Sequence, residues 1–189
     1  LFNYFDKIIY DCEEKHVANK ALLKKIKSVS IELFKNPLIQ KNSKSEFLTK
    51  VLSRLDNDIN NREVNLPKGD CHGDLTFSNM MYNIHTKKIV VFDFLNTYFD
   101  SPIQDMIKIK QDLAFNWTYQ KFPNKKDIDT KRFNIVSSYL DDKFENYFKS
   151  FDFYSENYRT LQTLNLLRIM VYSRDYKTIN YLLECIKRI

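Results

Sequence analysis

One short stretch decides how this chain is interpreted, and it reads His72-Gly73-Asp74-Leu75-Thr76-Phe77-Ser78-Asn79. It fits the pattern His-x-Asp-x-x-x-x-Asn, and a chance match in a chain of this length is on the order of one per cent. The only two glycines among the 189 residues, Gly69 and Gly73, both lie at this stretch. Because glycine adopts torsions and close approaches that other residues resist, we expect an unusual backbone here.

A β-hairpin is predicted immediately after this stretch. Residues 80–84 and 88–94 are rich in apolar and β-branched side chains, and residues 85–87 read as the turn between them. Since antiparallel neighbours lie about 5 Å apart, the hairpin should return Asp93 to the side of Asn79. Two oxygen ligands at the open end of a hairpin suit Mg²⁺, which leaves its other positions to water and phosphate oxygens.

Asp74 lies five residues before Asn79 and can face the same metal-bound phosphate. A carboxylate there can orient an acceptor hydroxyl and accept its proton. Each residue taken alone has a plain structural reading: Asp93 as a strand-end polar residue, Asn79 as a turn residue and His72 as a hydrogen-bonded core histidine. Their joint spacing around a hairpin favours the functional interpretation.

Most of the remaining chain is predicted to be helical, because apolar residues recur at helical spacing. Helical segments are expected over residues 1–34 as one helix or two, from Ser45 to Ile59, from Ile103 towards Trp117, and near 130–149, 155–173 and 174–188. Asn36-Pro37 ends the first region, and residues 123–127 mark a loop. The expected fold class is therefore mainly α with a small β-hairpin (α+β).

Composition narrows the functional classes. No apolar run approaches the length of a membrane span, and the first residues lack the features of a signal peptide. The three cysteines, Cys12, Cys71 and Cys185, are far apart and indicate reduced thiols in a cytoplasmic protein. A zinc site from Cys71, His72 and Cys185 is disfavoured because no paired Cys/His spacing occurs. The net charge of +6 goes with lysines spread along the chain, which argues against nucleic-acid binding.

Three segments together resemble the aminoglycoside phosphotransferase/choline kinase group of protein-kinase-like enzymes. They are residues 72–79, Val90-Val91-Phe92-Asp93-Phe94, and Asp100-Ser101-Pro102-Ile103-Gln104-Asp105, within a match over residues 70–112. The resemblance implies a protein-kinase-like C-terminal lobe over residues 1–189. Its N-terminal helices would occupy residues 1–65, its catalytic loop and metal-binding hairpin residues 66–95, and its C-terminal helices residues 103–189.

The same resemblance implies roles for individual residues. Asp74 would be the catalytic base, with His72 beside it in the catalytic loop. Asn79 and Asp93 would hold Mg²⁺ and the phosphates of ATP or GTP. His72 and Asp105 would brace the loop from behind, and Gly73 would support its backbone.

Two departures from protein kinases point to a small acceptor. Gly73 and Thr76 stand where protein kinases carry Arg and Lys, and about ten residues separate Asp93 from the helix expected at Ile103. A peptide-binding activation segment does not fit that interval, so the acceptor is expected to be a sugar, an amino sugar or a choline-like amino alcohol. Nothing before His72 offers a glycine-rich phosphate loop or a nucleotide lysine, so the N-lobe is expected to lie outside these residues.

Alternatives remain open at this point. A non-catalytic kinase-like nucleotide or ligand-binding module would keep the fold without the chemistry, and a basic helical nucleic-acid-binding protein would need its lysines clustered with aromatic residues. Acidic residues available to a cationic acceptor are Asp141, Asp142, Glu145, Asp152 and Glu156.

Overall fold

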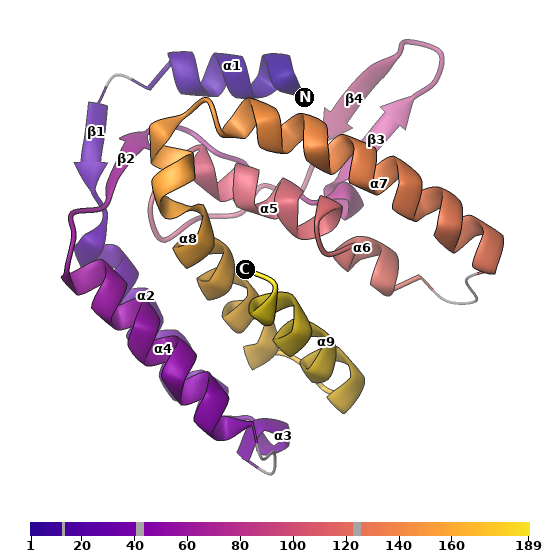
Figure 1. The fold of residues 1–189 in the computed structure, drawn as a ribbon. Helices are drawn as coiled ribbons and strands as arrows, with labels where there is room; N and C mark the ends of the chain where they lie inside the picture. The colour runs from indigo at the N-terminus through magenta and orange to yellow at the C-terminus, as the bar shows by residue number, and fades with distance from the viewer. Residues whose placement is uncertain (13, 41–43, 123–125) are drawn as a thin grey trace. The chain divides into compact units, whose positions relative to one another are not determined.

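A computed structural model describes residues 1–12, 14–40, 44–122 and 126–189 (Figure 1). The described residues are mostly helical and form two small two-stranded sheets, which confirms the expectation of a mainly α fold with a small β part. It divides into two compact units, each built from two chain segments: residues 1–16 with 66–156, and residues 17–65 with 157–189. None of the described helices is long and apolar enough to cross a bilayer.

The unit formed by residues 17–65 and 157–189 is helical. Its elements are α2 (Asn19–Lys35), α3 (Pro37–Gln40), α4 (Ser45–Asn60), most of α8 (Asp152–Val171) and α9 (Tyr176–Lys187). Helices α2 and α4 pack on each other and bury leucine and isoleucine side chains spaced at helical intervals. Asn19 connects them: its amide nitrogen donates to the carbonyls of Ile59 and Arg62 at 2.6 and 2.7 Å, which satisfies the end of α4.

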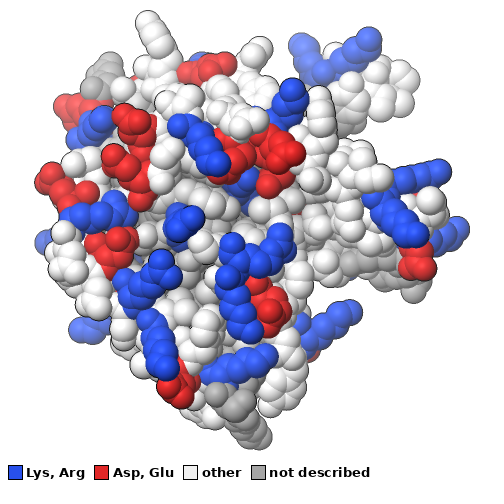
Figure 2. Space-filling model, viewed as in Figure 1, with Lys and Arg blue, Asp and Glu red and all other residues white. Residues whose placement is uncertain are grey.

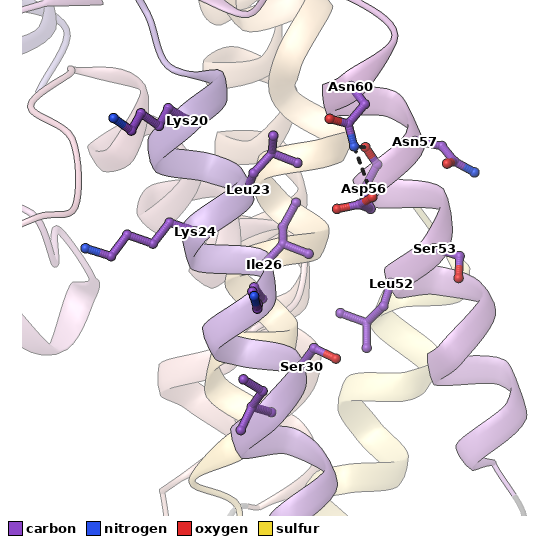
Figure 3. A pocket seen from close by; sticks show the side chains of 12 residues that line it. Lys20, Leu23, Lys24, Ile26, Ser30, Leu52, Ser53, Asp56, Asn57 and Asn60 are labelled. Carbon is purple, nitrogen blue, oxygen red and sulfur yellow. Dashed lines mark hydrogen bonds between the residues drawn. The ribbon is translucent and has the colours of Figure 1, made fainter.

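A groove of about 870 Å³ runs between α2 and α4 (Figure 3). Leu23, Ile26 and Leu52 point into the space between the two helices, whereas Lys20 and Lys24 point away from it. None of the predicted site residues lines this groove, so the candidate active site lies elsewhere.

The unit formed by residues 1–16 and 66–156 contains both sheets and the predicted site. Its elements are α1 (Phe2–Tyr10), most of β1 (Glu14–Val17) and β2 (Asn65–Lys68), a 3-10 turn (Phe77–Asn79), β3 (Met80–Asn83), β4 (Lys88–Val91), α5 (Ile103–Leu113), α6 (Trp117–Gln120), α7 (Asp127–Phe148) and the start of α8. Strand β1 pairs with β2, and β3 pairs with β4.

Helix α5 is buried along its whole length, with α6 and α7 packed against it. Its buried polar side chains are Gln104, Asp105, Lys108, Lys110, Gln111 and Asp112. A buried charge is costly unless it is paired. The partners of these side chains therefore identify the parts of the chain to which α5 is bonded. Lys110 pairs with Asp141 and Glu145 of α7 at 2.5 and 2.8 Å.

The predicted hairpin is present but shorter than expected. Strands β3 and β4 pair in an antiparallel register from Met80 opposite Val91 to Asn83 opposite Lys88. The second strand was expected to continue to Phe94, and this is wrong because β4 ends at Val91 and Asp93 has a left-handed backbone with φ 66°. That backbone conformation cannot continue a strand.

Other elements also differ from the sequence-based expectation: strand β2 and the short helices α3 and α6 were not predicted, and α5 ends at Leu113 although it was expected to run towards Trp117. The helical region expected over residues 1–34 contains two helices, α1 and α2, and the unpredicted strand β1 lies between them. Helix α7 begins at Asp127 rather than near residue 130, and residues 123–125 of the expected loop lie outside the described residues.

Charged side chains of both signs are interspersed on the face drawn in Figure 2. Apolar side chains are exposed as well, notably along the β3–β4 hairpin and just after it. These are Met81, Tyr82, Ile84, Ile89, Val90, Phe92, Phe94 and Leu95.

Candidate active site

Asp105 holds the start of the predicted catalytic loop from inside the protein. It lies in the first turn of α5 and is fully buried. Its Oδ2 accepts a hydrogen bond from the backbone N–H of His72 at 2.7 Å, and its Oδ1 accepts one from that of Gly73 at 2.9 Å. The hydroxyl of Tyr4 in α1 donates to Oδ2 at 2.7 Å. One carboxylate therefore fixes two consecutive loop residues and ties them to α1.

Burial dominates the ionisation of the groups around Asp105. It raises the pKa of Asp105, while the hydrogen bonds from Tyr4, His72 and Gly73 act in the opposite direction. Burial, followed by the charge of Asp105, raises the pKa of the Tyr4 hydroxyl. The same two causes raise the pKa of the Cys71 thiol to about 11, so Cys71 is a protonated thiol and a poor nucleophile.

His72 links the loop to the end of the hairpin. Its Nε2 lies 2.8 Å from the carbonyl oxygen of Phe92, and its Nδ1 lies 3.3 Å from the backbone N–H of Asp74. A carbonyl only accepts and a backbone N–H only donates, so the ring is the neutral tautomer with its proton on Nε2. The ring also lies against that of Phe94, with centroids 4.3 Å apart. His72 thus connects Asp74 to the segment that carries Asp93.

Gly73 is required by the close approach of two chain segments. Its φ is +82°, and a Cβ there would lie 2.3 Å from the carbonyl oxygen of Leu95 and 2.8 Å from the methyl carbon of Thr97. The backbone N–H of Leu95 also donates to the carbonyl of His72 at 3.0 Å. The unusual backbone expected at this glycine is therefore present.

The Asp74 carboxylate is held by two different donors. Lys108 of α5 places its ammonium nitrogen 2.8 Å from Oδ1, and the amide nitrogen of Asn79 lies 3.1 Å from Oδ2. That amide also donates to the Asp74 carbonyl oxygen at 2.9 Å. The carbonyl oxygen and Oδ2 of Asp74 can only accept hydrogen bonds here. The amide nitrogen of Asn79 therefore faces Asp74, and the Oδ1 of Asn79 faces away.

Asp112 anchors the far end of the loop. Its Oδ2 accepts from the backbone N–H of Phe77 at 2.5 Å, and its Oδ1 accepts from the backbone N–H of Thr118 at 2.7 Å. Burial raises the pKa of Asp112, while these donors and the charge of Lys108 lower it. The carboxylate therefore joins the loop to the start of α6.

Asp93 lies one residue beyond the position expected for it. The residue opposite Asn79 is Phe92, whose backbone N–H donates to the carbonyl of Asn79 at 3.2 Å. Asp93 is exposed and follows directly, in its left-handed conformation. Such a conformation in a non-glycine residue is uncommon and concentrates at functional sites.

Two of the acidic residues considered for an acceptor are already paired. Asp141 and Glu145 contact the ammonium of Lys110, whereas Asp142, Asp152 and Glu156 are exposed. Within the described part of the chain, no group of three or more His, Cys, Asp or Glu side chains is arranged to hold a metal ion.

The loop, the hairpin and the start of α5 lie within a region that matches a known family. The sequence model of the ecdysteroid kinase-like family matches residues 3–109, which is more than half of the chain. The chain belongs to the ecdysteroid kinase-like family. Neither the curated proteins nor the solved structures contain a significant match to it.

The ecdysteroid kinase-like family is a protein-kinase-like relative of the phosphotransferase and choline kinase group, so the resemblance found from the motifs holds at this coarser level. The family match ends at residue 109. It therefore includes Lys108, which sequence reasoning did not single out, but not Asp112. The available signal was spacing: Asp105, Lys108 and Asp112 lie at i, i+3 and i+7, on one face of a helix.

An Asp105→Asn variant of this ecdysteroid kinase-like protein is expected to unfold more easily. Asparagine would set an NH₂ group against one of the two backbone N–H donors, leaving buried donors without an acceptor. We expect a loss of about 3 kcal/mol in the free energy of unfolding, measured by chemical denaturation. Tyr4→Phe is the graded control: it removes one donor, keeps both backbone hydrogen bonds, and should cost about 1 kcal/mol. Wild-type stability in Asp105→Asn would contradict this bracing.

Proposed function

We propose that this chain carries the catalytic loop of a kinase that transfers the γ-phosphate of ATP to a hydroxyl of a small molecule. The observation that supports it best is the Asp74 carboxylate, held by a loop that α5 fixes and followed by Asn79 and Asp93 at the hairpin. Membership of a kinase-like family gives the same reaction class.

In this proposal Asp74 orients the acceptor hydroxyl and receives its proton as the phosphate is transferred. The Oδ1 of Asn79, which faces away from Asp74, and the carboxylate of Asp93 would hold Mg²⁺. Both are hard oxygen ligands of the kind this ion prefers. Bound magnesium supplies positive charge against the phosphate oxygens. His72 and Asp105 hold the loop in place and do not contact the reacting atoms.

The exposed apolar side chains of the hairpin offer a surface for the rest of the nucleotide site. Phe92 and Phe94 flank Asp93 and are 39% and 65% exposed. We propose that the nucleotide and the phosphate-covering part of the kinase, an N-lobe, contact this surface. Assays should therefore use the longest natural chain that contains residues 1–189.

The proposal is tested by a phosphate-transfer screen with [γ-³²P]ATP and Mg²⁺. The acceptor panel contains an ecdysteroid, as the family's name suggests, together with sugars, amino sugars and choline. We expect magnesium-dependent ATP consumption that rises with one acceptor class, and no consumption when EDTA removes the metal. Absence of both MgATP binding in calorimetry and turnover with every acceptor would refute the proposed function.

A non-catalytic nucleotide-binding module is the second candidate. The observation that favours it is the ion pair between Asp74 and Lys108, which engages one oxygen of the carboxylate that would have to accept the proton. The same experiment separates the two functions: a binding module would bind MgATP in calorimetry but transfer no phosphate to any acceptor.

A further inference from the structure

Lysine is an unusual residue at a buried helix position such as that of Lys108. Its side chain is 5% exposed and its ammonium contacts Asp74, whose side chain is 26% exposed. Removing an ammonium from water costs several kcal/mol, and an apolar side chain of similar volume is often as stable or more stable in such a place. Helix packing alone therefore does not explain a lysine here.

The charge of Lys108 is directed towards the loop. It forms an ion pair with Asp74 and also lowers the pKa of Asp112, four residues further along α5. Loop residues 73–79 contain no lysine or arginine. The positive charge that contacts Asp74 in this ion pair therefore comes from α5 and not from the loop.

The two oxygens of Asp74 are held from different directions. Lys108 contacts Oδ1 from α5, and Asn79 contacts Oδ2 from the end of the loop. A carboxylate with only one donor could rotate about its side-chain bonds, and the misplacement of a reacting group by about 1 Å can cost a hundredfold in rate. With two donors the orientation of the carboxylate is defined.

We propose that Lys108 is a positioning residue that holds the carboxylate of Asp74 in the orientation needed to receive a proton from the acceptor. This inference rests on the proposed phosphotransfer. Lys108 acts through Asp74 and lies beneath the loop, so it is not itself required to touch the substrate.

Lys110 supplies a matched control on the same helix. It is as buried as Lys108, at 3% exposure of the side chain, and its ammonium also pairs with carboxylates. Those carboxylates belong to α7 and not to the loop. Lys110→Met therefore reproduces the loss of a buried ammonium from α5 without disturbing Asp74.

The test is a double-mutant cycle of Lys108→Met and Asp74→Asn, read as hydrolysis of MgATP with water as the acceptor. Rates are divided by the folded fraction from circular dichroism. We expect Lys108→Met to lower kcat about 10- to 100-fold and to change the KM for MgATP less than about twofold. In the Asp74→Asn background, Lys108→Met should lower kcat by less than about twofold, because the group it positions is already inactive. Lys110→Met should keep the wild-type kcat per folded molecule.

Two results would overturn the role of Lys108 while leaving the phosphotransferase intact. One is a wild-type kcat per folded molecule in Lys108→Met. The other is an equal loss of kcat in the wild-type and Asp74→Asn backgrounds, which would show that Lys108 does not act through Asp74. A wild-type protein that hydrolyses no MgATP and transfers phosphate to no acceptor would instead overturn the proposed function, and this role with it.

Discussion

An Asp74→Asn variant is expected to lose about a hundredfold or more in turnover while it binds MgATP nearly as tightly as the wild type. Asparagine keeps the size of the side chain and an oxygen to accept from Lys108 or Asn79, but it cannot take a proton from the acceptor. The effect should therefore fall on kcat. Steady-state kinetics gives the turnover, and calorimetry gives the affinity for MgATP.

Asp70→Asn is the matched control for this variant. Asp70 is exposed and lies just before residues 72–79, so its substitution makes the same change of charge outside that stretch. It should leave turnover unchanged. Near-normal turnover of Asp74→Asn would remove Asp74 from the chemistry.

The second large effect is expected at the proposed metal ligands. Asp93→Ala should weaken the binding of magnesium-nucleotide and largely abolish turnover, because a carboxylate is the stronger ligand for a hard dication. Asn79→Ala should act in the same direction but less severely, since a neutral amide contributes less. Calorimetric titrations of ATP at several magnesium concentrations measure both effects.

The backbone of Asp93 needs its own control. Alanine is less tolerant than aspartate of a φ of 66°, so part of the effect of Asp93→Ala could arise from strain. Asp93→Asn keeps a residue that tolerates this conformation while removing the negative charge. If both variants bind nucleotide with the wild-type magnesium dependence, Asp93 is not a metal ligand.

Local signals in the sequence were enough to predict the hairpin and the longer helices, but not the short elements β1, β2, α3 and α6. Two runs rich in apolar and β-branched residues around a turn identified the hairpin, and helical spacing identified α4, α5 and the three C-terminal helices. Strand β1 was missed because four residues, Glu14 to Val17, carry too little pattern. The end of β4 was misplaced because Phe92, Asp93 and Phe94 look like a strand in sequence, while the backbone turns at Asp93.

The candidate site was only partly predictable, because the burial of some of its residues depends on tertiary packing. Asp105 was expected near the loop because the motif resemblance placed it there. Lys108 and Asp112 were not, because a charged residue in a helical pattern is usually exposed to solvent. Their burial depends on α6 and α7 covering the other faces of α5, and that is a tertiary fact that helical spacing does not contain.

The spacing of three residues along helix α5 matches the spacing of the loop groups that they contact. Asp105 binds the backbone of residues 72 and 73, Lys108 the side chain of Asp74, and Asp112 the backbone of Phe77. The helix rises about 10 Å between Asp105 and Asp112, and each added residue would turn it by about 100°. An insertion or deletion of one residue between them would move Asp105 and Asp112 onto different faces. We therefore expect the part of α5 between Asp105 and Asp112 to tolerate substitutions more readily than insertions or deletions, because both end residues must reach the same loop.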